Sequence, residues 1–135
     1  PRNEVMFGPP GYAYVYFTYG NHHCMNVVTG KKGVANAVLI RALEPIAGIP
    51  LMQKRRNKIR LEDLASGPGK LTQALGIDRR LNGEDLTKNS LWICEGDSNS
   101  RVRWVATPRI GITRGTRLRY RFLIRSSKFV SKRSS

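Results

Sequence analysis

The pattern of apolar and polar positions near the start of the chain predicts a β-hairpin. Residues 12–19 read YAYVYFTY, a run in which aromatic and β-branched residues dominate and no Gly or Pro interrupts, as is typical of a strand. Gly, Asn and His at positions 20–22 predict a turn, and residues 24–29 return as a second strand. We therefore expect a hairpin whose tip falls near residues 19–22.

A continuous apolar segment comes next and is followed by two helical segments. Residues 34–43 carry Arg41 as their one charge, a pattern that predicts a buried strand. Residues 46–58 predict an irregular helix that becomes basic toward its end, which suits the helix dipole. Residues 70–75 predict a second helix, closed by Gly76 at its C-cap.

The last third of the chain is dominated by short strand patterns. We expect strands at residues 91–94, 102–105, 109–112 and 118–125, and a frayed tail at residues 126–135. Strands then outnumber helices, and the helices cluster in the middle of the chain. The sequence therefore predicts an α+β fold: one domain over residues 1–135, with a curved antiparallel or mixed β-sheet, a protruding β-hairpin and a few helices.

Charge changes this picture by pointing to a partner. The chain has 24 Lys and Arg against 9 Asp and Glu, a formal net charge of +15 and a pI near 10.8. No acidic residue follows Asp97, whereas Lys and Arg are frequent there. Solubility alone needs a net charge of only about 2–8, so the excess indicates a polyanion, with nucleic acid first. For any single C-terminal basic residue, a merely solvated strand face remains the alternative.

Cysteine and histidine usage excludes several classes. Cys24 and Cys94 form no CxxC motif and lie far apart, so we expect a reduced, intracellular protein with buried thiols. His22 and His23 have no ligand partners at metal spacing, so we predict no metal site and no cofactor. No apolar run is long enough to span a membrane, and we expect no membrane partner.

The aromatic hairpin is the strongest candidate for chemistry. An aromatic strand is often simple core, and that alternative applies to Tyr12, Tyr14 and Tyr16. Tyr19 differs because it falls at a polar tip with little to pack against. An exposed aromatic can stack on bases at about 1–3 kcal/mol per base, or wedge into a duplex beside an extruded nucleotide. Strand parity places Tyr16 and Tyr19 on different sides of the ribbon.

Several spaced motifs occur in one order along essentially the whole chain. They are Pro1-Arg2-Asn3, Met6-Phe7, Pro10-Gly11, Tyr14-Val15-Tyr16 with Tyr19-Gly20, Cys24-Met25-Asn26, Arg41-Ala42-Leu43-Glu44-Pro45, Ser66-Gly67-Pro68-Gly69-Lys70-Leu71, Gln73-Ala74-Leu75, Arg109-Ile110-Gly111-Ile112, Arg121-Phe122 and Phe129-Val130-Ser131. In this order and spacing the chain is similar to the alkyladenine (3-methyladenine) DNA glycosylase family. The resemblance implies a base-flipping DNA repair protein.

The resemblance also implies roles for individual residues. Tyr19 matches the tyrosine that enters the DNA stack, and Tyr16 the tyrosine that stacks on the flipped base. Asn26 matches the asparagine at the pocket floor that discourages undamaged guanine through its 2-amino group. Arg41 matches an arginine at the pocket and backbone of the extruded nucleotide. Lys70 matches a phosphate contact, and its place at a helix start suits an anion.

Tyr14 belongs to the same motif, and we include it among the DNA-binding residues. Glu44 does not match the general base of the family, and we interpret it as structural. The resemblance implies that the base lies in a preceding segment with a Glu-Ala-Tyr motif and a downstream His, for which Glu4 is out of place. We therefore predict that this chain holds no catalytic residue and binds better than it cuts, because a positioned base contributes roughly 10²–10⁴ in rate.

Two main hypotheses follow from the resemblance. The first is a monofunctional hydrolase that removes alkylated purines of the 3-methyladenine type and leaves an abasic site. The second is a fragment or paralogue that only binds damaged DNA. A basic RNA-binding domain is a third, but no RNP-type or GXXG signature supports it. We expect a monomer that binds double-stranded DNA with alkylated or deaminated purines, in the cytoplasm with the nucleoid if bacterial and in the nucleus if eukaryotic.

Overall fold

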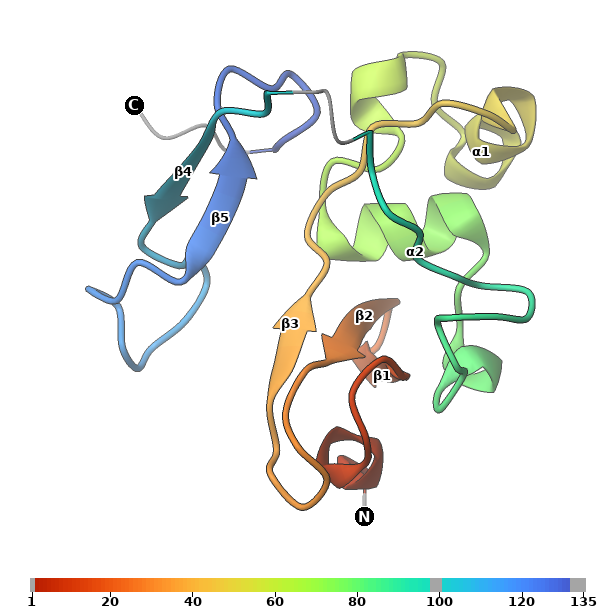
Figure 1. Cartoon of the computed structure of the whole chain (residues 1–135). Helices are drawn as coiled ribbons and strands as arrows, with labels where there is room; N and C mark the ends of the chain where they lie inside the picture. Colours follow the sequence, from red (N-terminus) through yellow and green to blue (C-terminus); the bar gives the residue numbers. More distant parts are fainter. Residues whose placement is uncertain (1, 98–100, 132–135) are drawn as a thin grey trace.

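The computed structural model describes residues 2–97 and 101–131, and within them it has an α+β architecture (Figure 1). The expected fold class is confirmed: two helices accompany a three-stranded and a two-stranded antiparallel sheet in the described residues. The elements are β1 (Ala13–Thr18), β2 (His22–Val28), β3 (Ala37–Leu39), α1 (Ile49–Arg56), α2 (Pro68–Leu75), β4 (Trp104–Thr107) and β5 (Arg121–Ile124), with 3₁₀ turns at Glu4–Phe7, Leu61–Asp63 and Arg79–Leu81.

The predicted hairpin is present as β1 and β2, and its two faces differ. Strand order in the larger sheet is β1-β2-β3, and Tyr16 pairs with Cys24 while Tyr14 pairs with Asn26. Because neighbouring residues on a strand point to opposite faces, these four side chains share one face. The other face is core, where Ala13, Val15 and Met25 pack with Ile77 and Leu86.

The hairpin tip is a tight turn with unusual backbone geometry. Tyr19 has φ of 52° and Gly20 has φ of 68°, and the amide of Asn21 donates to the carbonyl of Thr18 at 3.4 Å. Two successive positive φ angles are the pattern of a type I′ turn, which matches the twist of the strands. A bulky residue in this region carries strain of order 1–3 kcal/mol, and such strain concentrates at functional sites.

The strand predicted over residues 34–43 is much shorter in the structure. Only Ala37–Leu39 pairs with β2 as a strand, and Val38 is 54% exposed rather than buried. The prediction of a long buried strand was therefore wrong, although it placed β3 in the right part of the chain.

A helix residue lies where β3 ends. The amide of Ile40 still donates to the carbonyl of Met25 at 3.0 Å. The next β2 carbonyl on this side is that of His23, and the hydroxyl of Thr72 in α2 lies 3.0 Å from it and also 3.0 Å from the carbonyl of Gly69. Beyond this point the chain leaves the sheet, and the amide of Leu43 donates to the carbonyl of Ala65, in the segment that precedes α2.

The two helices lie side by side in Figure 1 and are joined by arginine side chains. Arg55 Nη1 donates to the carbonyl of Ala74 at 3.1 Å, and Arg56 Nη1 donates to Gln73 Oε1 at 2.6 Å. The first helix, expected over residues 46–58, is confined to Ile49–Arg56 because left-handed residues flank it. The second helix begins two residues earlier than predicted, and its C-cap at Gly76 is confirmed (φ 69°).

The C-terminal part forms a β4–β5 ribbon in which Trp104 pairs with Ile124. Strands expected at residues 91–94 and 109–112 do not form, and the strands expected at 102–105 and 118–125 are β4 and β5 with shifted bounds. A positive φ of 69° at Gly111 turns the chain where a strand was predicted.

The described part of the predicted frayed tail is ordered against the rest of the chain. Residues 126–131 pack back on the protein: Lys128 Nζ lies 3.5 Å from Glu62 Oε1, and Phe129 is half-buried. The remainder of the expected frayed tail, residues 132–135, lies outside the described residues, as does Pro1 of the first motif. Cys24 is buried as expected, but Cys94 is exposed because its segment is a surface loop. Within 2–97 and 101–131, no helix has the length and apolarity needed to cross a bilayer.

Candidate nucleic-acid interface

A cavity of about 1170 Å³ separates the larger sheet from the β4–β5 ribbon. Its walls include β3 and β5, the orange and blue strands of Figure 1, together with the chain from Ile40 to Glu44. The volume is slightly above the ~300–1,000 Å³ usual for small-molecule sites. Its polar lining includes Tyr16, Asn26, Arg41, Glu44 and Arg121.

Tyr16 presents an aromatic surface at the edge of this cavity. The side chain is half-buried, and its ring centroid lies 5.2 Å from that of Tyr14. The guanidinium of Arg2 lies 4.9 Å from the centroid of the Tyr16 ring. Arg2 Nη2 also donates to the carbonyl of Phe17 at 2.8 Å. Burial, and then the neighbouring Cys24, raises the pKa of Tyr16 to about 12. A phenol is neutral at physiological pH with or without this shift, so Tyr16 presents an uncharged ring.

Asn26 lies beside Tyr16 on the same face of the hairpin. It is 8% exposed, and its Nδ2 donates to the carbonyl of Tyr14 at 3.2 Å. This bond holds the amide in one position, so its bulk and polarity are fixed within the lining of the cavity. Tyr14 itself is buried and does not line the cavity, so its part is to support Tyr16 and Asn26.

Two guanidinium groups make the cavity attractive to anions. Burial, and then the charge of Arg121, lowers the pKa of Arg41. Arg121 is 7% exposed, and its Nη1 donates to Thr107 Oγ1 at 3.3 Å. Arg41 nevertheless stays protonated, because a guanidinium is not deprotonated in proteins. Like charges held close together favour an anion that neutralises them, for which a phosphate or a carboxylate is suitable.

Arg121 is the site residue that the sequence interpretation missed. The C-terminal arginines were treated as one basic surface, yet Arg121 is buried whereas Arg117, Arg119 and Arg125 are exposed. The one sequence signal that separates it from the others is its place in a motif shared with the family, Arg121-Phe122.

Tyr19 and Lys70 form a second group, outside the cavity, where the hairpin tip meets the start of α2. Tyr19 is 84% exposed, compared with 63% for Tyr120, and its ring centroid lies 5.8 Å from that of His22. Lys70 is exposed, with Nζ 3.4 Å from Ser66 Oγ. The six predicted residues therefore fall into three groups. Tyr16, Asn26 and Arg41 line the cavity, and Tyr14 lies behind them. Tyr19 at the hairpin tip and Lys70 at the start of α2 lie outside the cavity.

Carboxylates are scarce at the cavity. Of the described residues that line it, Glu44 is the one carboxylate, and its side chain is exposed. Across the described parts of the chain, no group of three or more His, Cys, Asp and Glu side chains is arranged to hold a metal ion.

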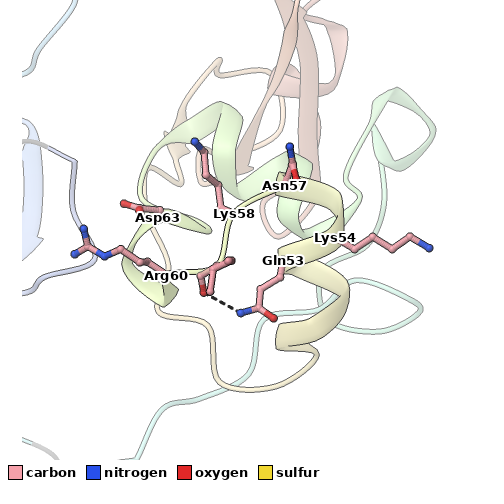
Figure 2. A pocket seen from close by; sticks show the side chains of 7 residues that line it. Gln53, Lys54, Asn57, Lys58, Arg60 and Asp63 are labelled. Carbon is pink, nitrogen blue, oxygen red and sulfur yellow. Dashed lines mark hydrogen bonds between the residues drawn. The ribbon is translucent and has the colours of Figure 1, made fainter.

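A smaller surface hollow of about 530 Å³ lies at the end of α1 (Figure 2). Gln53 Nε2 donates to the carbonyl of Ile59 at 2.8 Å within it, which ties the helix to the segment that follows. Figure 2 shows Lys54 and Arg60 extending away from the hollow rather than converging on it. The hollow therefore lacks the convergent polar groups of a binding site.

Comparison with known proteins gives the class of this protein. The family model of methylpurine-DNA glycosylase (MPG) matches residues 1–128. The chain therefore belongs to the methylpurine-DNA glycosylase family, a family of DNA repair proteins, and the predicted membership is confirmed.

Individual relatives agree with that class. The chain is 56% identical over 133 residues to a protein of Carboxydothermus hydrogenoformans, a match that covers 98% of this chain and 70% of the relative. A Methanoculleus marisnigri protein is 50% identical, again with 98% and 70% covered, and a Chlorobaculum tepidum protein is 49% identical, with 97% and 63% covered. All three carry the provisional name 3-methyladenine DNA glycosylase. The chain thus spans roughly two thirds of their length.

The raised pKa of Tyr16 gives a first testable prediction. A tyrosine whose folded pKa exceeds its unfolded value of about 10 stabilises the fold below pH ~10, and that contribution is lost as pH rises toward 12. In a spectrophotometric titration of the folded protein, Tyr16→Phe should remove a phenol that ionises near pH 12. If the variant instead removes a phenol that ionises near pH ~10, the burial of Tyr16 is contradicted.

Proposed function

We propose that this protein binds duplex DNA, rotates an alkylated or deaminated purine out of the helix into the cavity, and removes it by hydrolysis of the N-glycosidic bond. The product is an abasic site, and the preferred lesions are of the 3-methyladenine type. The observation that carries the proposal is the meeting of Tyr16, Asn26 and Arg41 at one cavity in a chain of this family. The protein acts as a monomer, in the compartment that holds the DNA.

Each cavity residue has a role that its surroundings support. Tyr16 is a neutral ring on which a flipped purine stacks, and alkylated purines that carry positive charge stack well on an aromatic face. Asn26 is fixed by its bond to Tyr14 and discriminates by shape against the 2-amino group of guanine. Arg41 and Arg121 lie where they attract the phosphate of the extruded nucleotide.

The hairpin tip contacts the duplex that the base leaves behind. Tyr19 enters the base stack and fills the gap, which stops the base from returning. Lys70 contacts a phosphate beside it, at the start of α2. The formal charge of +15 supplies the long-range attraction that brings DNA to the protein.

The chemical step needs a group that the described residues do not supply in position. Water oxygen attacks C1′ of the sugar, the C1′–N bond breaks, and its electron pair leaves with the base. A cationic alkylated base leaves as a neutral molecule and needs no proton, whereas the attacking water must lose one. We assign no described residue to that proton transfer, because Glu44 is exposed and is a single carboxylate with no partner that would position it.

The scarcity of carboxylates also supports a second candidate function. In that alternative the chain recognises damaged DNA by the same residues and performs no chemistry. Both candidates require selective binding, and only the first requires excision.

The deciding experiment uses a duplex that carries one hypoxanthine or one alkylated adenine. We expect this chain to bind the lesion more tightly than a matched undamaged duplex, and Tyr16→Ala to abolish that preference. Abasic sites are measured in the same samples with protein in excess, and we expect excision at least ~10²-fold slower than that of a longer relative, because no described residue is assigned as the positioned base.

The outcomes separate the possibilities. Excision at the rate of a longer relative would overturn the absence of a catalytic residue, and Glu44→Gln would then show whether Glu44 supplies it. No preference for either lesion over plain duplex would overturn the function itself. Preference without measurable excision favours the binding alternative.

A further inference from the structure

The side chain of His22 packs the hairpin tip against the start of α2. A Cβ atom built on Gly69 would lie 2.8 Å from both Cγ and Cδ2 of His22. Real Cβ atoms do not approach ring atoms so closely, so the imidazole occupies the space that any side chain at position 69 would take. The ring therefore packs directly on the helix backbone, where β2 and α2 are neighbours in Figure 1.

The same imidazole is held by the residues of the tip. Its ring centroid lies 5.8 Å from that of Tyr19, with 37° between the planes. Its Nδ1 lies 2.6 Å from Asn21 Oδ1. His22 thus stands between the exposed tyrosine and the helix, and it has a contact in each direction.

Tyr19 needs such a support. It is 84% exposed and has a left-handed backbone with φ of 52°, so neither burial nor a relaxed turn fixes its ring. A side chain that inserts into a base stack must keep its orientation while the duplex is bent around it, and preorganised groups bind more tightly than mobile ones.

We propose that His22 is a positioning residue for Tyr19, with the bare backbone of Gly69 as its seat. The proposal rests on the insertion of Tyr19 into DNA proposed above, and it deepens that function by naming what holds the inserted ring. His22 acts through packing: its ring links the tip to α2, and α2 in turn carries Lys70 at the same end. The inserted ring and the phosphate contact are thereby held at a fixed separation.

The experiment measures the lesion preference, which is the ratio of the Kd for plain duplex to the Kd for duplex with one lesion. His22→Ala is expected to lower this ratio about 3- to 10-fold, and His22→Phe, which keeps a ring, to retain most of it. Gly69→Ala should lower the ratio as His22→Ala does, because the added methyl displaces the imidazole. Alanine favours the helix more than glycine does, so this variant does not lose α2.

Two controls separate positioning from a general loss of structure. His23→Ala removes the adjacent histidine, whose ring packs on Phe17 with centroids 4.9 Å apart and not on Tyr19, and should leave the ratio unchanged. Urea unfolding of each variant reports stability separately. In a Tyr19→Ala background, His22→Ala should produce no further fall in the ratio, because coupled residues are not additive.

The outcomes that overturn the proposal are distinct from those that overturn the function. An equal fall for His22→Ala with and without Tyr19 excludes positioning. Equal losses for His22→Phe and His22→Ala would show that a polar contact of the imidazole, with Asn21 or with DNA, matters instead of its packing. If Tyr19→Ala alone leaves the ratio unchanged while the chain still prefers lesions, the insertion by Tyr19 fails first, and the support by His22 fails with it.

Discussion

Raising the salt concentration from about 50 to about 200 mM is expected to weaken duplex binding by roughly 10³-fold or more, the effect of neutralising about six or more phosphates. The cause is release of counterions from DNA by a chain with a formal charge of +15. Fluorescence anisotropy of a labelled duplex, repeated across the salt series, gives the slope of log K against log salt.

The slope can be apportioned by single substitutions. Lys70→Ala removes one proposed phosphate contact and should reduce the slope by about 1, with a similar loss on lesion and plain duplex. Lys58→Ala is the matched control: Lys58 lines the hollow at the C-terminal end of α1, and its substitution should leave the salt slope unchanged. A nearly flat salt response of the unmodified chain would remove the basic surface from the account of binding.

Tyr19→Ala is expected to weaken binding to lesion-containing duplex by about 5- to 150-fold, which corresponds to ~1–3 kcal/mol for one lost stacking contact. Binding to plain duplex should change much less, because a base that stays stacked leaves no gap to fill. Parallel titrations of the two duplexes, identical except for the lesion, give both affinities.

The control for this result is another exposed aromatic residue. Trp92 is 61% exposed and is not among the residues that line the cavity, so Trp92→Ala should leave the lesion preference intact. Tyr19→Phe keeps the ring and should retain most of the affinity. Equal losses on the two duplexes after Tyr19→Ala would show that Tyr19 contacts DNA without entering the stack.

Local patterns in the sequence predicted part of the local structure. The hairpin was found because its strands and turn are neighbours in the chain and carry strong preferences of their own. The C-cap at Gly76 was found for the same reason. The length of β3 was missed because the strand ends where another element, α2, meets the sheet, with the hydroxyl of Thr72 3.0 Å from the carbonyl of His23. No periodicity within residues 34–43 records that contact.

In the candidate site, too, residues set by local pairing were predicted and a residue set by tertiary packing was not. Tyr16 and Asn26 were named from a family motif, and pairing of β1 with β2 brings them to one face. Arg121 was missed because its burial depends on how the β4–β5 ribbon lies against the rest of the chain. A run of arginines looks alike in sequence whether its members face solvent or a cavity, and burial of a single guanidinium is a tertiary property.

The hydroxyl of Thr72 ties the recognition parts to one cooperative unit. It lies 3.0 Å from the carbonyl of His23, at the point where the segment after β3, which carries Arg41, leaves the sheet and runs along the cavity. Its helix also carries the glycine beneath the hairpin tip. If α2 detaches, the position of Arg41 along the cavity and the seat of His22 on Gly69 are lost in the same opening event. Amide exchange in the segments on both sides of the helix should then report one common opening free energy, and lesion recognition should be present or absent as a whole.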